Sequence, residues 1–284
     1  MTPAVRILAE RFATPAAFLK AARPFLQESE VENALILGVA MDLSERDPTS
    51  HPQPYFGCAR DGDRILMCAF RSLADRAGIT RTLDPAAIPI LADAVHEECP
   101  TIREVVGPEP VIGEFARSMA SLLGRRAYVR RASRIHVLET VRPPSRPAPG
   151  RLRIAVASDH GRVAGWIEGF LRDVNEEGDP RDIADRRIRE KRLFLWEDGE
   201  PVSMAASSGK TPNGIRVNFV YTPPELRGRG YASACVAAMS QALLDAGNRY
   251  CCLYTDLANP TSNKIYREIG YEPVCDTASY GFDT

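Results

Sequence analysis

The 284-residue sequence predicts a mixed α/β fold, with α and β elements around a mixed sheet, in two halves. Helix-like and strand-like segments alternate along the chain. A proline-rich segment, Val141 to Gly150, interrupts them near the middle, because its four prolines cannot continue a helix or a central strand. The order of elements after this break resembles the order before it. These observations suggest a diverged internal duplication of residues 1–140 and 151–284, joined by an extended linker at residues 141–150.

The first half is expected to begin with helices and to continue with strands and helices. The spacing of its apolar residues predicts helices at 16–26, 30–40, Leu83 to about His96, and 112–123. Short apolar runs predict strands at 55–59, 65–70, 104–106 and 135–138. The first two strands are joined at Asp61-Gly62-Asp63, which is a good hairpin turn.

The second half is expected to start with a strand at 152–157. Ser158 or Asp159 caps the following helix, which runs to about Val174. An acidic turn at 175–180 leads to a helix at 181–191. The remaining expected elements are strands at 193–196, 202–207 and 215–221, a helix at 230–246, a strand at 250–255, a helix at 262–269 and a short terminal hairpin.

Composition predicts an ordinary soluble globular protein. Hydrophobic residues make up 44% and charged residues 26%, and the formal net charge of −1 favours neither nucleic acid nor an anionic membrane as partner. The first ten residues do not resemble a signal peptide, and no apolar run reaches the length of a membrane span. We therefore expect a cytoplasmic protein with no membrane segment.

Seven cysteines are scattered along the chain without metal-binding spacing. Cys251 and Cys252 are adjacent in an expected strand, where neighbouring side chains point to opposite faces. They are therefore poor partners for one disulfide. We expect reduced cysteines that pack as small core residues, and no bound metal.

Residues 217–232, VNFVYTPPELRGRGYA, combine a strand, a glycine-flanked basic turn and a helix start. Gly228 and Gly230 let the backbone approach a bulky ligand, and the helix start offers free N–H groups to a pyrophosphate. Arg227 and Arg229 add positive charge nearby. The alternative is a surface turn with two arginines.

Two other phosphate-binding motifs are excluded by spacing. A nucleoside triphosphate loop requires GxxxxGK followed by Ser or Thr, which this segment lacks. A dinucleotide fingerprint requires a third glycine, and Ser233 stands at that position.

Two elements of the second half resemble the GNAT N-acetyltransferase superfamily. The pattern Arg-x-x-Gly-x-Ala, formed by Arg227, Gly230 and Ala232, resembles its coenzyme A pyrophosphate signature. The later segment from Leu253 to Tyr271 resembles its strand–loop–helix element, with matches at Asn259, Ser262, Ile265-Tyr266 and Gly270-Tyr271. The resemblance covers residues 151–284 and implies a GNAT fold there. It also implies a tandem arrangement, with a degenerate GNAT-like first half that lacks the cofactor motif.

This resemblance implies transfer of an acetyl group from acetyl-CoA to a primary amine of a small molecule or peptide. In the family, the fourth strand holds the pantetheine arm. The corresponding residues of this sequence are Phe219, Val220, Tyr221 and Thr222. In the family, backbone amides of the following turn hold the pyrophosphate. The corresponding residues of this sequence are Arg227, Gly228, Arg229, Gly230, Tyr231 and Ala232. The resemblance further implies coenzyme contacts from Asn259 and Ser262, and places Tyr266 beside the sulfur, where it protonates the leaving thiolate.

The residues themselves leave the catalytic roles open. Tyr266 could instead be a packed aromatic beside Ile265 and Ile269. Many family members carry a Glu on the fourth strand, but here Asn218 occupies that stretch, where it could position a water without acting as a base. Glu225 is expected to face solvent beside the phosphate turn.

The connection between the first two helices usually selects the substrate in this family. Its carboxylates could attract a cationic amine, or they could form a solvated turn that caps the next helix; these are Asp173, Glu176, Glu177 and Asp179. Trp166 and Phe170 share a helix face and are expected in the core or a pocket wall, and His160 at the surface. Two rival functions remain: an acyl-CoA sensor without turnover, and an interaction protein that acts through its first half. No feature of the sequence defines an oligomeric state.

Overall fold

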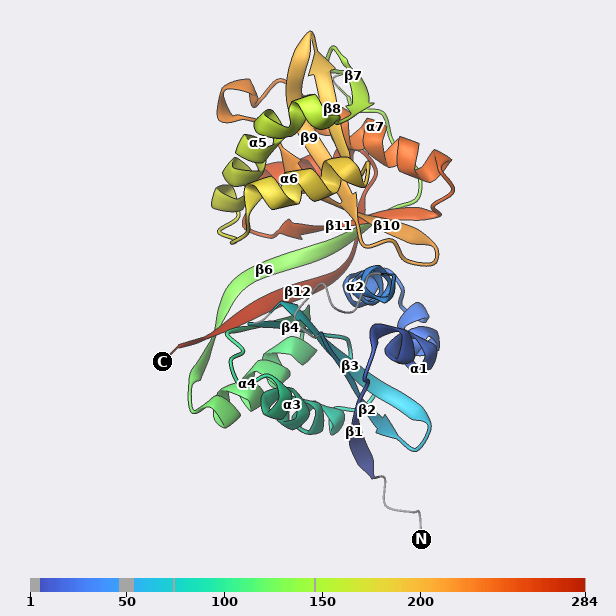
Figure 1. Cartoon of the computed structure of the whole chain (residues 1–284), viewed down its shortest axis with the longest axis vertical. Helices are drawn as coiled ribbons and strands as arrows, with labels where there is room; N and C mark the ends of the chain where they lie inside the picture. The colour runs from blue at the N-terminus through green and yellow to red at the C-terminus, as the bar shows by residue number, and fades with distance from the viewer. Residues whose placement is uncertain (1–5, 46–53, 74, 146, 284) are drawn as a thin grey trace.

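The structure, a computed structural model, describes residues 6–45, 54–73, 75–145 and 147–283. Its described strands form one twelve-stranded mixed sheet in the order β1-β2-β3-β4-β5-β12-β6-β11-β10-β9-β8-β7. Figure 1 shows the two halves as two stacked bodies, with the long strands β6 and β12 running between them. The predicted mixed α/β fold is confirmed.

The two halves repeat one order of helices and strands. The first half consists of β1 (Ile7–Arg11), α1 (Pro15–Gln27), α2 (Ala34–Ser44), β2 (Tyr55–Asp61), β3 (Arg64–Leu73), β4 (Arg76–Ile79), α3 (Ala87–Glu98), β5 (Glu104–Pro108), α4 (Val111–Leu123) and β6 (Arg126–Leu138). The second consists of β7 (Arg151–Ile154), α5 (His160–Asp173), α6 (Pro180–Arg189), β8 (Leu193–Asp198), β9 (Glu200–Ser208), β10 (Gly214–Tyr221), α7 (Tyr231–Asp245), β11 (Tyr250–Asp256), α8 (Pro260–Glu268) and β12 (Glu272–Asp283). Apart from two short 3₁₀ turns, η2 (Ala157–Asp159) and η3 (Pro224–Leu226), the orders are identical.

The structure corrects several expected elements. Strands β1 and β4 were not expected, because both are short, and the second helix begins at Ala34 rather than at residue 30. The strand expected at 135–138 is the end of the 13-residue β6. The expected terminal hairpin is wrong: residues 272–283 form one 12-residue strand, β12, whose register with β6 shifts at two points. The linker residues 141–145 and 147–150 are irregular, as predicted.

Each half lends its last strand to the other half. In the second half, β11 pairs with β6 rather than with β12, because β6 of the first half lies between them. In the first half, β12 of the second half lies between β5 and β6 and pairs with both. The sheet is therefore completed on both sides by a strand that follows the other half's last helix (Figure 1).

Helices cover both faces of the sheet around four larger apolar clusters. In the first half, α3 and α4 pack on one face and α1 and α2 on the other. In the second half, α7 and α8 pack on one face and α5 and α6 on the other. Cys251 lies in the α7 cluster and Cys252 in a small cluster with Ala34 of α2, which confirms that the adjacent cysteines face opposite sides. All seven cysteines are free, as expected.

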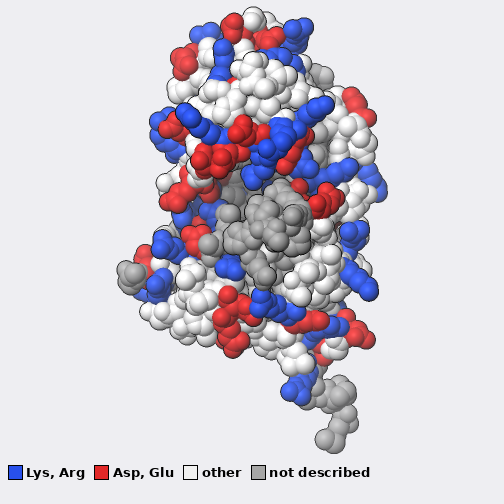
Figure 2. All heavy atoms as spheres, viewed as in Figure 1, with Lys and Arg blue, Asp and Glu red and all other residues white. Residues whose placement is uncertain are grey.

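Polar contacts join the halves at several places. The Glu30 carboxylate accepts hydrogen bonds from Thr211, Asn213 and Tyr250 of the second half. On another part of the interface, Glu176 pairs with Arg76 and Arg131 of the first half. Figure 2 shows acidic and basic side chains interspersed on the face that it presents, in keeping with the near-zero net charge. No helix in the described ranges is long and apolar enough to cross a bilayer.

Candidate functional site

The parallel strands β10 and β11 separate near the middle of the second half. They pair only from Gly214–Tyr250 to Arg216–Cys252, although β10 continues to Tyr221 and β11 to Asp256. Beyond the paired stretch, the edge of β10 that faces β11 offers backbone N–H and C=O groups to a ligand. An extended amide-containing chain could pair with this edge as another strand would.

A bulge marks the point where β10 leaves the regular sheet. Its register with β9 shifts between Asn218 and Tyr221, and Phe219 has a φ of +49°. A left-handed conformation is uncommon for a large side chain and is typical of functional sites. The Phe219 ring packs against Phe170 of α5 at 5.0 Å between ring centroids, and both rings pack against the apolar cluster under α5 and α6.

The glycine-flanked turn between β10 and α7 has an open backbone. Gly228 and Gly230 have φ values of +78° and +81°, which glycine adopts easily. A side chain at Gly228 would meet no other atom within 4 Å, so the turn is open there. The first backbone bond of α7 joins the Ala234 N–H to the Gly230 carbonyl. In the described structure the N–H groups of residues 228–233 have no hydrogen-bond partner, so they are available to a pyrophosphate.

The side chains of this turn are less free than the sequence suggested. Arg227 donates to the Thr222 carbonyl at 2.9 Å and pairs with Asp173 at 2.6 Å. The Tyr231 hydroxyl donates to Asp198, which fixes the first residue of α7 to the end of β8. Arg229 donates to the backbone carbonyl of Glu225 at 3.3 Å. The turn is therefore braced by side chains, while its backbone amides remain open.

A cavity of about 360 Å³ lies beside this turn. It is lined by residues of β6, the end of α5 and the end of β11, which are Val129, Arg130, Arg131, Ala132, Asp173, Val174, Asn175, Asp256 and Ala258. It adjoins the turn because Asp173 both lines the cavity and pairs with Arg227. One wall comes from β6, so the first half contributes directly to this cavity.

Tyr266 lies on α8 and is 8% exposed, within the apolar cluster beneath α7. Its ring meets that of Tyr271 edge-on at 5.7 Å. Burial, followed by the nearby Cys235 thiol, raises the pKa of Tyr266 above its usual range, so the hydroxyl keeps its proton. The packing fits the packed-aromatic alternative, and the retained proton fits the acid role.

Asn218 lies on the face of β10 that is covered by α5 and α6. Its Nδ2 donates to Ser208 Oγ at 2.8 Å, while its buried Oδ1 has no partner in the described structure. Glu225 is exposed, as expected. No group of three or more His, Cys, Asp and Glu residues that could hold a metal occurs in the described ranges.

The structure gives other roles to several of the remaining predicted residues. Asn259 is the N-cap of α8, and its side chain accepts from the Ser262 N–H at 3.1 Å. In the acidic turn, Asp179 caps α6, Asp173 pairs with Arg227, and Glu176 pairs with two arginines. This turn is thus tied down by charge pairs and caps, which agrees with the capping alternative.

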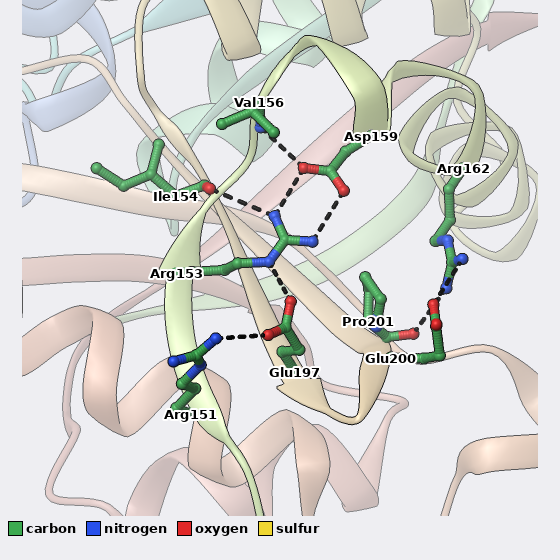
Figure 3. Close-up of polar contacts among 9 residues, drawn as sticks. All are labelled: Arg151, Arg153, Ile154, Val156, Asp159, Arg162, Glu197, Glu200 and Pro201. Atoms are coloured by element: carbon green, nitrogen blue, oxygen red, sulfur yellow. Dashed lines mark hydrogen bonds and ion pairs between the residues drawn. The ribbon is translucent and has the colours of Figure 1, made fainter.

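A charge network positions the start of α5 (Figure 3). Arg153 of β7 binds the Asp159 carboxylate through two hydrogen bonds of 2.7 and 2.9 Å, and it also binds Glu197 of β8. Asp159 accepts from the Val156 N–H at 2.8 Å. Asp159 is the N-cap residue of α5, as expected, but its carboxylate makes no capping hydrogen bond to the helix and binds Arg153 and the Val156 N–H instead. His160, at the helix start, is half-buried and pairs with Asp185.

The described residues of the first half do not repeat this open turn. Its parallel pair β4 and β5 also joins over three residues, but the cavity beyond it has a volume of only about 20 Å³. Seven residues, none of them glycine, connect β4 to α3, whereas nine residues connect β10 to α7.

Two arginines beside the bulge were not found from the sequence. Arg187 of α6 is buried, and Arg216 of β10 lies near Ser208. A signal for Arg187 existed: it follows Ile183 by four residues and Ala184 by three, so it shares their inward helix face.

Comparison with known proteins agrees with this geometry. Residues 196–280 match the family model described as FR47-like protein. This range includes the glycine-flanked turn and Tyr266. The whole chain superposes on a tandem GNAT protein from the clavulanic acid biosynthesis pathway, with a TM-score of 0.57, 12% identity and 98% coverage of both chains. The chain has the tandem GNAT fold.

Other solved structures share this tandem GNAT fold. A Drosophila protein has a TM-score of 0.69 and 13% identity, over 98% of this chain and 99% of its own. A GCN5-related N-acetyltransferase from Sphaerobacter thermophilus has a TM-score of 0.58 and 14% identity, over 96% and 94%. No match to the sequence is found among curated proteins. The resemblance to the GNAT superfamily, with a GNAT-like first half, is confirmed at the level of the fold.

Proposed function

We propose that the chain is an N-acetyltransferase that moves an acetyl group from acetyl-CoA to a primary amine. The observation that carries this proposal is the open backbone of residues 228–233, which follows the bulged and separated end of β10. We assign the pyrophosphate to these amides and the pantetheine arm to the free edge of β10. The proposed domain division keeps residues 151–284 as the coenzyme-binding half and residues 1–140 as a half without a coenzyme site.

In the proposed reaction, the amine nitrogen attacks the thioester carbonyl, a C–N bond forms, and the C–S bond breaks. A backbone N–H near Phe219 would stabilise the oxyanion that develops on the carbonyl. Tyr266 would donate its proton to the thiolate as it leaves, and the amine would lose a proton to solvent or to a water held by Asn218.

A thermal-shift titration tests coenzyme binding. Because a ligand that binds only the native state must stabilise it, acetyl-CoA should raise the melting temperature by several degrees at saturation. Free adenosine diphosphate should give a smaller shift, since it lacks the pantetheine arm. An unchanged melting temperature in folded, ligand-free protein would refute the assignment.

An acyl-CoA sensor without turnover is the second candidate. The observation that favours it is Asn218 on the strand where many family members carry a Glu. Release of coenzyme A during incubation with a panel of amines separates the two functions. Binding without any amine-dependent release would identify the sensor.

A further inference from the structure

Arg187 is a buried cation with an unsatisfied donor. It is 9% exposed, on the face of α6 that packs against the sheet. Its Nη1 donates to the Ser207 carbonyl at 3.2 Å, and its guanidinium carbon lies 5.9 Å from the centroid of the Phe219 ring. Its buried Nε has no hydrogen-bond partner in the described structure. A buried donor without a partner is uncommon and calls for an explanation.

Arg216 and Asn218 complete a cluster at the same bulge. They are two residues apart on β10, so their side chains lie on one face of the sheet. Both donate to Ser208 Oγ, at 3.2 Å from Arg216 Nη2 and 2.8 Å from Asn218 Nδ2. Their other polar atoms, Arg216 Nη1 and Asn218 Oδ1, are buried without a partner among the described residues. Two cationic donors and one acceptor are therefore unsatisfied beside Phe219.

The electrostatic balance of this cluster is positive. Burial, followed by the charge of Arg186, lowers the pKa of Arg187 to about 10, and Arg216 and Arg192 act in the same direction. Glu190 opposes this shift, but it lies 3.9 Å from Arg187 and is also within 3.6 Å of Arg192. Arg192 is itself paired with Asp42 at 3.2 Å. An added anion would relieve the repulsion among the arginines and satisfy their free donors.

We infer that Arg187 and Arg216 bind a carboxylate of the amine acceptor, while Asn218 Oδ1 accepts a hydrogen bond from its amine. This inference rests on the proposed acetyl transfer. Two guanidinium donors without a partner among the described residues match the two oxygens of a carboxylate. Because Asn218 directly precedes Phe219, the amine bound to it would lie beside the bulge, where the thioester is proposed to lie. The acceptor class is therefore an amine with a nearby carboxylate, such as a free amino acid or a small peptide.

A binding experiment tests this without requiring turnover. L-amino acids, each paired with its carboxamide, are titrated calorimetrically into the full chain, with and without coenzyme A. At least one amino acid should bind about tenfold or more tightly than its amide, and Arg216→Gln and Arg187→Gln should each remove this preference. Arg151→Gln, which removes a mostly exposed arginine from β7, should leave it unchanged.

The contrary outcomes are distinct. Equal binding of acid and amide, or no binding of either by folded protein, overturns the inference, whether or not coenzyme A binds. If the protein does not bind coenzyme A but still prefers the amino acid to its amide, the proposed function is refuted and the carboxylate subsite is supported. Inorganic phosphate that binds more tightly than every carboxylate, and loses affinity in Arg187→Gln, would reassign the cluster to a phosphate group.

A stability measurement separates this role from a structural one. Arg187→Met keeps much of the side-chain volume and removes the buried charge, so the ligand-free variant should melt at the same or a higher temperature. It should also lose the carboxylate preference. A clearly lower melting temperature would show that Arg187 holds the fold together, and would overturn its assignment to the subsite.

Discussion

Glu30 and Thr211 are 181 residues apart in sequence, and the Thr211 hydroxyl donates to the Glu30 carboxylate at 2.6 Å. The same carboxylate accepts from the backbone and side chain of Asn213 and from the Tyr250 hydroxyl. One side chain of the first half therefore holds the turn between β9 and β10, the strand to which the pantetheine arm is proposed to bind. This turn is a point where the first half supports the proposed site without touching a ligand.

Glu30→Gln should destabilise the protein by about 2–3 kcal/mol, because an amide cannot accept every bond that the carboxylate accepts. Burial raises the pKa of Glu30, but its hydrogen bonds outweigh burial and leave the pKa below its ordinary value of 4.5. A lowered folded-state pKa gives stability that is present above pH 4.5 and is lost as the pH falls through the folded pKa. Urea unfolding at neutral and acidic pH should show the parent–variant difference shrinking in acid. Glu28→Gln, an exposed neighbour, serves as control, and a pH-independent difference would contradict this account.

Gly230→Val should weaken coenzyme binding by about tenfold or more. A branched side chain disfavours the φ of +81° and would project where the pyrophosphate is proposed to lie. Gly247→Val is the matched control, since Gly247 has a φ of +95° at the other end of α7. Both variants should lose stability, but only Gly230→Val should lose affinity in calorimetric titration. Equal affinities for acetyl-CoA would show that the turn has a structural role only.

Tyr266→Phe should lower kcat by roughly a hundredfold or more, as expected for loss of a positioned acid. Affinity for acetyl-CoA should change little, because the hydroxyl acts mainly as the sulfur gains charge. Tyr271→Phe is the control: it removes the 2.9 Å contact with Ser240, which costs about 1 kcal/mol of stability, and should retain kcat. If both variants turn over at the parent rate while chemistry limits, Tyr266 is a packed aromatic and solvent supplies the proton.

Asp159→Asn should destabilise the second half by about 1–3 kcal/mol, because it leaves Arg153 with a poorer partner. The hydrogen bond from Arg153, more than any other cause, lowers the pKa of Asp159 below its ordinary value, so this contribution is also lost in acid. Glu200→Gln disrupts the exposed pair with Arg162 shown in the same figure and should change stability by less than about 0.5 kcal/mol (Figure 3). Similar losses in both variants, measured by chemical denaturation, would contradict the importance of burial here.

Local patterns predicted the elements of the second half well, because each helix and strand carries its own periodicity. The turn at Gly228 and Gly230 was also predictable, since its glycines and the following helix are adjacent in sequence. Residues 272–283 were expected to form a short hairpin, but they form the single strand β12, whose pairing and bulges depend on its distant partners β5 and β6. Sequence periodicity cannot choose between a strand's own half and the other half as partner.

The acceptor side of the site depends on such distant contacts. Arg187 and Arg216 come together because α6 folds across β9 and β10, and neither arginine belongs to a motif. The role of Glu30 was equally hidden, because its partners lie more than 180 residues away. Asn259 shows the opposite case, in which one residue fits both a family motif and an ordinary helix cap.

The exchange of β6 and β12 also constrains how the chain folds during synthesis. When the ribosome has completed the first half, β5 and β6 still lack the strand that lies between them, and they wait exposed until β12 emerges. Both halves then complete their folding in a single late step, in which β12 pairs with β5 and β6. Such contacts between residues far apart in sequence form slowly. The first half therefore cannot be deleted without removing β6, a central strand beside β11, from the half that carries the proposed coenzyme site.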